Sequence, residues 1–257
     1  MFHLKGSAPS SEKPKIEIEP APAYSASKTV FASMFIHEGD CIHMLQFPQR
    51  DIDTLRVVIN QSWDKGIQRE RLLYSSCHEF KLHGSPWNMS HWTGSENIPG
   101  QVLMREIFAC LFSAGWILHA RNNGLLIFRQ QQTSPQRDWI SITVIGFYKL
   151  RLIGASAELI ALFRDILESM GLLQEDFWKE RDNNAWEFKI KGNPRSVFGE
   201  EMVQWNLLML RIVETLEAHG WSLYSNTMQY QQNVCVSYGW FCVKDKQWVP
   251  GMTIVRG

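Results

Sequence analysis

Asp51, Asp53 and Thr54 resemble the Asp-x-Asp-x-Thr motif of phosphatases that form an aspartyl-phosphate, although Thr54 here follows Asp53 directly. That chemistry requires the first carboxylate to lie at the tip of a buried strand, as a nucleophile beside a metal ion. Here Pro48, Gln49 and Arg50 separate Asp51 from the preceding apolar segment, and helical apolar spacing begins directly after it. Asp is a common N-cap residue at such a position. We therefore interpret Asp51 as a helix cap and predict no catalytic residue in this motif.

Histidine and cysteine, the residue types that bind zinc, are concentrated in the first half of the chain. No pair of them has zinc-finger spacing, and neither CxxC nor HExxH occurs. The chain also lacks the glycine-rich phosphate-binding motifs and the GxSxG nucleophile elbow. We predict neither a metal site nor a cofactor. The residues considered were His37, His43, His78, His83, His91, His119, Cys41, Cys77 and Cys110.

Charge and composition disfavour several classes of partner. The formal net charge is zero and no basic block occurs, so the chain lacks the electrostatic signature of a nucleic-acid or membrane-surface binder. No apolar run approaches the roughly 20 residues that span a bilayer. An odd count of five cysteines without CxxC favours a reducing compartment. The N-terminus lacks a secretory apolar region and carries acidic residues that transit peptides avoid. We expect a cytoplasmic or nuclear protein.

An internal repeat organises the chain. The segment Leu103–Trp116 has helical apolar spacing, and the segment Leu208–Trp221 repeats it 105 positions later. Both end in Gly-Trp. A glycine just after a helix provides the left-handed C′ conformation, so Gly115 and Gly220 are predicted to have positive φ. The tryptophans that follow, Trp116 and Trp221, are predicted to lie in the core.

The same offset relates the first helix of each half. Asp51 and Ser156 are predicted N-caps, and Gly66 and Gly171 are predicted C′ residues. A strand follows in each half, starting at Cys77 and at Ala185, now 108 positions apart.

Each half also opens with a hairpin and closes with a strand pair, which gives the order β-β-α-β-α-β-β. The predicted fold class is α+β, with two tandem copies of a two-layer sandwich on a mainly antiparallel sheet. We expect a pseudo-two-fold relation between the copies. The predicted organisation is a disordered tail (1–29), a first repeat (30–135), a second repeat (136–244) and an irregular C-terminal tail (245–257).

The segment from Phe80 to Trp116 carries Phe-x-x-x-Gly-x-Pro-Trp followed by a leucine-rich helix that ends in Gly-Trp. This pattern resembles a family of uncharacterised fungal proteins, over residues 30 to about 225. Some members carry the label of a Mediator subunit, which no motif in these residues supports. The second copy departs from the pattern at Arg195, which stands in place of tryptophan. The resemblance implies a fold and no activity, cofactor or catalytic residue.

The loop from Gly84 to Gly100 is the strongest candidate for binding, because loops on a rigid scaffold often carry binding residues. Its tryptophans can instead cover the open edge of the sandwich, since large aromatic side chains are usually packed. A second candidate is the junction between the copies near Arg195. The candidate ligand- or partner-binding residues are Trp87, Met89, His91, Trp92 and Arg195.

The sequence does not define the function. It favours a non-catalytic interaction or ligand-binding module whose partner is an unknown protein or a small ligand. The alternatives are an enzyme of unrecognised class with a site at the junction between the repeats, and a transcription-associated or RNA-binding protein. An RNA-binding sheet needs exposed aromatic residues with a basic rim, and the neutral charge argues against it.

Overall fold

The computed structural model describes residues 29–252 except 38, 75, 88–97, 123, 133–136, 147, 193–198 and 232–233, and it describes the backbone alone at the remaining positions within 227–238. The first half contains β1 (Phe31–His37), β2 (Cys41–Leu45), α1 (Gln49–Ser62), β3 (Ile67–Leu73), β4 (Cys77–Leu82), α2 (Ile98–Ser113), β5 (Trp116–Asn122) and β6 (Leu125–Gln130). The second half contains β7 (Arg137–Ile145), β8 (Lys149–Ile153), α3 (Ala157–Ser169), β9 (Leu173–Glu180), β10 (Ala185–Ile190), α4 (Gly199–Ala218), β11 (Trp221–Gln231) and β12 (Val234–Asp245).

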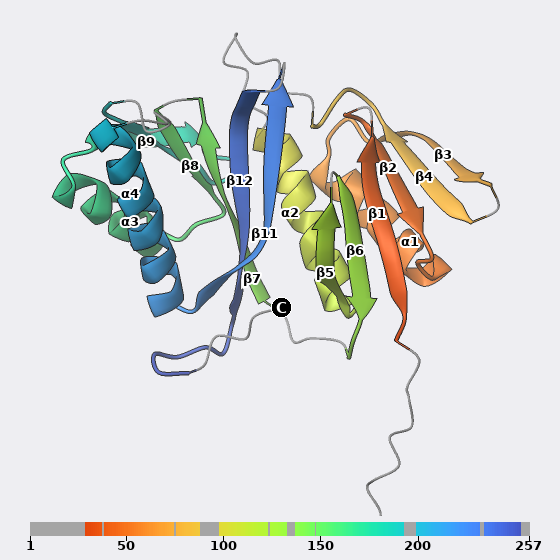
Figure 1. Ribbon diagram of the computed structural model, residues 1–257. Coiled ribbons are helices and arrows are strands. Elements are labelled where there is room, and N and C mark those ends of the chain that lie inside the picture. The colour runs from red at the N-terminus through yellow and green to blue at the C-terminus, as the bar shows by residue number, and fades with distance from the viewer. Residues whose placement is uncertain are drawn as a thin grey trace, which may run out of the picture.

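Each half forms its own six-stranded antiparallel sheet (Figure 1). The strand order is β3-β4-β2-β1-β6-β5 in the first sheet and β9-β10-β8-β7-β12-β11 in the second. The second order is the first with every strand number raised by six, so the two halves share one topology. This confirms the predicted α+β fold class and the tandem repeat.

Each copy has one strand more than the sequence analysis predicts, namely β3 and β9. Both are edge strands that pair on one side only, with β4 and with β10. The sequence of β3, Ile-Gln-Arg-Glu-Arg-Leu-Leu, has no alternating apolar pattern, and none of its residues is buried. Charged edge strands of this kind lack the period-2 signal by which a strand is recognised.

The prediction that Asp51 caps α1 is wrong. The N-cap of α1 is Pro48, which makes no side-chain cap bond, whereas Ser156 caps α3 as predicted and accepts from the backbone N of Leu159 at 3.2 Å. Pro48 and Ser156 are 108 positions apart, so the helix starts follow the offset of the strands. Asp51 lies in the first turn, where its carboxylate is buried against the indole of Trp116.

Each sheet packs one face against its own pair of helices and so forms a separate core. The inner faces of β4 and β10 supply Phe80 with Leu82 and Phe188 with Ile190, as the alternation predicts. Trp116 and Trp221 are both buried, and Gly115 and Gly220 have φ of 86° and 81°, which confirms the predictions for these positions. None of the helices in the described part of the chain is long and apolar enough to span a membrane.

The helix α2 lies between the two sheets (Figure 1). One side belongs to the first core, and the other packs on the second sheet, where the ring centroids of Phe108 and Phe241 are 5.1 Å apart and those of Phe112 and Trp139 are 5.5 Å apart. The layers are therefore first sheet, α1 with α2, second sheet, and α3 with α4.

The copies meet at two places. The helix α2 of the first copy packs on the second sheet, and β5 meets β11, where Nη1 of Arg121 donates at 3.3 Å to Oδ1 of Asn226, its counterpart 105 positions later. The first contact joins a helix to a sheet, and the second joins equivalent strands.

Candidate functional site

Of the five residues that the sequence singles out for binding, the structure places Trp87. Its side chain is partly buried against the first core, and its backbone N donates to the carbonyl of Gly39 at 3.2 Å, in the turn between β1 and β2. A packing role accounts for these contacts. The other four lie outside the described residues; they are Met89, His91, Trp92 and Arg195.

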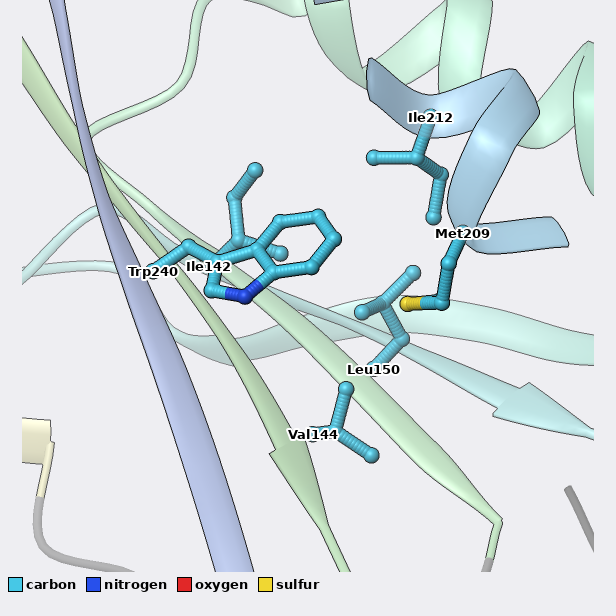
Figure 2. A pocket seen from close by; sticks show the side chains of 6 residues that line it. All are labelled: Ile142, Val144, Leu150, Met209, Ile212 and Trp240. Carbon is cyan, nitrogen blue, oxygen red and sulfur yellow. The ribbon is translucent and has the colours of Figure 1, made fainter. Parts of the chain in front are cut away.

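A small hollow lies between α4 and the second sheet (Figure 2). It has no room for even a water molecule, whereas pockets for drug-sized ligands begin at roughly 300 Å³. None of its lining side chains is ionisable, so it cannot supply an acid or a base. The lining residues are Ile142, Val144, Leu150, Met209, Ile212 and Trp240.

The junction between the copies, where the sequence analysis places the site of an alternative enzyme, is filled by aromatic rings. Phe108 and Phe112 of α2 meet Tyr224 of the second sheet with centroid distances of 5.6 Å and 5.5 Å. The Tyr224 hydroxyl accepts from the backbone N of Leu118 at 2.9 Å, and burial raises the pKa of Tyr224 well above its usual value. A hydroxyl held in this way joins the two sheets and is unsuited to proton transfer at neutral pH.

Three of the cysteine thiols in the described part of the chain are poor nucleophiles. Burial raises the pKa of Cys41 and of Cys110 to about 11, and that of Cys242 to about 12. The thiolate, which is the reactive form, is therefore scarce at neutral pH. Within the described part of the chain, no three His, Cys, Asp or Glu side chains gather as metal ligands would.

The face of the first sheet that points away from α1 and α2 differs from its counterpart in the second sheet. The two faces are equivalent by strand register. Ser33 and Ser141 are 108 positions apart and occupy the same place in β1 and β7; Ser33 pairs with Ile127, and Ser141 pairs with Phe241. In the second sheet this face lies under α2, whereas no described helix packs on it in the first sheet. We call it the open face. Its principal members are Phe31, His43, Leu45, Cys77, Glu79, His119 and Ile127.

A buried carboxylate organises the polar part of the open face. Oε1 of Glu79 accepts from Nε of Arg71 at 2.7 Å and from a terminal nitrogen of Arg69 at 3.2 Å. Its other oxygen, Oε2, lies 3.0 Å from Nε2 of His43 on the neighbouring strand. The hydrogen bonds from Arg71, together with those from His43 and Arg69, lower the pKa of Glu79 to about 2, against the effect of burial. Glu79 is therefore a fixed anion that holds two arginines on the surface, and it is not a general base.

The second copy contains the same arrangement in a buried form. Glu187 corresponds to Glu79, and Arg151 corresponds to His43, because each pair is opposed across the same two strands. Glu187 accepts from a terminal nitrogen of Arg151, and both side chains are buried. The carboxylate is thus common to both copies, and it pairs with half-exposed arginines in the first copy and with a buried arginine in the second.

Sequence reasoning missed this cluster, although a signal was present. The tripeptide Glu-Phe-Lys occurs at Glu79 and again at Glu187. The phenylalanine lies on the inner face of each strand, so the glutamate before it lies on the outer face. A charged residue that recurs between two inner-facing positions would have indicated the cluster.

Comparison with known proteins gives a family and no activity. The model of an uncharacterised family matches residues 30–123 and again residues 138–243, which confirms the predicted resemblance at the level of the tandem repeat. No curated protein matches the chain significantly. Among solved structures, a conserved kinetoplastid-specific protein from Trypanosoma cruzi is 13% identical, with a TM-score of 0.31 over 42% of this chain and 95% of that chain.

Proposed function

Because the chain belongs to the uncharacterised family whose model it matches twice, and because its described residues assemble no catalytic group, we propose that it is a non-catalytic interaction module. It binds a protein partner through the open face of the first sheet. The four cysteines whose side chains are described are free thiols, which supports a reducing compartment, the cytoplasm or the nucleus.

One observation carries this proposal. The two sheets present equivalent faces, and the chain covers one of them with α2. At positions equivalent to those under α2, the first sheet keeps apolar side chains in solvent. Phe31 is 39% exposed and corresponds to Trp139, and Leu45 is 36% exposed and corresponds to Ile153. Apolar side chains grouped on one face are typical of a surface that a partner covers.

The chemistry of the open face suits a protein partner. Apolar side chains lie at Phe31, Leu45 and Ile127, and the arginines held by Glu79 lie toward the β3 edge. Protein interfaces combine an apolar centre with a polar rim, and they are enriched in aromatic residues and arginine. Since Arg69 and Arg71 are already oriented by a carboxylate, little side-chain entropy is lost when a partner contacts them.

We also propose that the loop from Gly84 to Gly100 contributes to binding, as its residue types suggest. The side chains that contact the ligand or partner would be Met89, His91 and Trp92, while Trp87 anchors the loop beside Gly39. Arg195 is the candidate in the second copy.

The test compares variants that differ in one surface only. The open-face variant combines Phe31→Glu with Leu45→Glu, and the control variant is Val57→Asp, on the exposed side of α1. Proteins captured by the wild-type chain are purified and titrated against all three. A binder whose affinity falls at least about tenfold with the open-face variant and is unchanged with the control supports the proposal. Equal affinities for all three proteins would assign binding to another surface.

A further inference from the structure

The helix α4 carries an apolar strip in solvent. Val203, Leu207 and Leu210 are 51%, 48% and 58% exposed. Their spacing of four and three residues places them on one side of the helix. This side faces outward from the last layer of the molecule, since the opposite side of α4 contributes Leu208 and Ile212 to the second core (Figure 1).

The corresponding side of α2 is covered. The positions equivalent to Val203 and Leu207 lie 105 residues earlier, at Ile98 and Val102. Ile98 is buried in a cluster with Ile153 and Ala185 of the second sheet, and Val102 packs against that cluster. Arg105, the counterpart of Leu210, reaches Gly154 so closely that a Cβ on that glycine would lie 2.2 Å from the guanidinium. The helix positions that contact a sheet in the first copy are thus the ones left exposed in the second.

The sheet surface that α2 contacts has a counterpart in the first copy, the open face, which no described helix covers. Ile153 and Ala185 correspond to Leu45 and Cys77 of the open face, 108 residues earlier. Trp139 and Tyr224 pack together at 4.9 Å, and their counterparts Phe31 and His119 pack together at 5.4 Å. Among the described residues, one end of the molecule is therefore a sheet face without a covering helix, and the other end is a helix face without a covering sheet.

From these two uncovered surfaces, the open face and the α4 strip, we propose that the partner of the open face is a second copy of this chain. The α4 strip of one molecule packs on the open face of the next and repeats the contact that joins the two copies within each chain. This inference rests on the proposed function, because it uses the same open face. The contact buries Val203, Leu207 and Leu210 against Phe31 and Leu45.

Charge supports the same pairing. Within the chain, Phe112 of α2 packs against Tyr224 of the second sheet. Between molecules the corresponding residues are Glu217 of α4 and His119 of the open face. Arg129 lies beside them, opposite Phe31 in the sheet. An aromatic contact inside the molecule thus corresponds to an acidic side chain facing an imidazole and the cationic Arg129 at the surface, which favours this orientation over the stacking of like faces.

The geometry of assembly follows from the contact. Two different surfaces join, so each molecule retains one free surface after pairing. Association then proceeds head to tail, to an open chain of molecules or a closed ring. A symmetric dimer is not expected.

The test is sedimentation equilibrium on the full chain, from low micromolar to the highest attainable concentration. The helix variant combines Leu207→Asp with Leu210→Asp, the open-face variant is Phe31→Glu with Leu45→Glu, and Val57→Asp is the control. All of these side chains are substantially exposed, so the variants should fold, and thermal melting checks this. For a variant that does not fold, Leu207→Ser with Leu210→Ser or Phe31→Ser with Leu45→Ser replaces it.

The wild type and the control should form oligomers larger than dimers, and each interface variant alone should associate at least about tenfold more weakly. An equimolar mixture of the two variants should form dimers only, because each still has one intact surface. A wild type that stays monomeric at every concentration overturns the self-association, and the open face then remains testable with captured partners. Association lost in the open-face variant but kept in the helix variant supports the open face as a site and overturns α4 as its partner. Association kept in the open-face variant overturns both.

Discussion

The indole nitrogen Nε1 of Trp116 donates to Oδ2 of Asp51 across 2.7 Å, and both groups are buried. The bond ties the first turn of α1 to the first residue of β5, which are 65 positions apart. It explains why an aspartate occurs in a buried first turn that a proline already begins. A buried indole N–H needs an acceptor, and the Asp51 carboxylate provides it.

Replacing Asp51 with alanine should lower the free energy of unfolding by about 2 kcal/mol, because the Trp116 N–H is then buried without its acceptor. Asp53→Ala, at a side chain that is half exposed, should change it by less than about 0.5 kcal/mol. Urea denaturation measures both. A double-mutant cycle with Trp116→Phe should show strong non-additivity, and additive losses would mean that the bond contributes nothing.

Gly115 and Gly171 both have positive φ, but their surroundings differ. A Cβ at Gly115 would lie 2.5 Å from the carbonyl oxygen of Gln131, whereas a Cβ at Gly171 would meet nothing within 4 Å. Gly171→Ala should therefore cost only backbone strain, about 1 kcal/mol. Gly115→Ala should cost more than about 2 kcal/mol, because a backbone clash adds to the strain. Equal melting temperatures for the two variants would contradict this account.

Glu79 predicts a specific dependence of stability on pH. Its pKa in the folded protein is about 2, below the ordinary value of 4.5, chiefly because Arg71 donates to it. The unfolded chain therefore binds its proton first as pH falls, and the stabilisation is full above pH 4.5 and is lost between 4.5 and 2.

The matched variant is Glu79→Gln, which removes the charge and keeps the shape. At neutral pH it should be less stable than wild type by about 2 kcal/mol, since hydrogen bonds to a charged group are lost. The difference should shrink as pH falls through this window. A difference that stays constant down to pH 2 would show that the arginines do not hold the carboxylate ionised.

The two copies should unfold together, because α2 belongs to both packing interfaces. Phe108→Ala should cost about 3–5 kcal/mol, since the buried ring contacts both Tyr224 and Phe241. Val213→Ala, at the partly exposed counterpart on α4, should cost far less. Calorimetry should give one transition for the wild type, with equal calorimetric and van't Hoff enthalpies. Two resolved transitions in the wild type would show that the copies fold independently.

The loop from Gly84 to Gly100 yields a prediction that rests on residue types. The double variant His91→Ala with Trp92→Ala should weaken binding of an identified partner without lowering the melting temperature, because aromatic anchors often dominate binding energy. Titration of the purified partner measures the effect. Unchanged affinity would remove the loop from the site and leave the open face and Arg195 as candidates.

The sequence by itself determined the repeat, the helices, the hairpins and the core tryptophans. Each is encoded locally: apolar spacing defines a helix face, and a glycine at a helix end defines the turn. Gly115 and Gly220 adopt the predicted conformation for this reason. The strands β3 and β9 were not predicted, because edge strands that pair on one side need no alternating pattern.

Tertiary structure decided which surfaces are buried. The partner of Asp51, the carboxylate cluster of Glu79 and the place of α2 between two sheets all depend on contacts between residues distant in sequence. Ile98 and Val203 occupy equivalent helix positions, yet one is buried and the other is in solvent. Sequence periodicity identifies the side of a helix that is apolar. Whether a second layer covers that side is set by how the two copies stack, which no local pattern encodes.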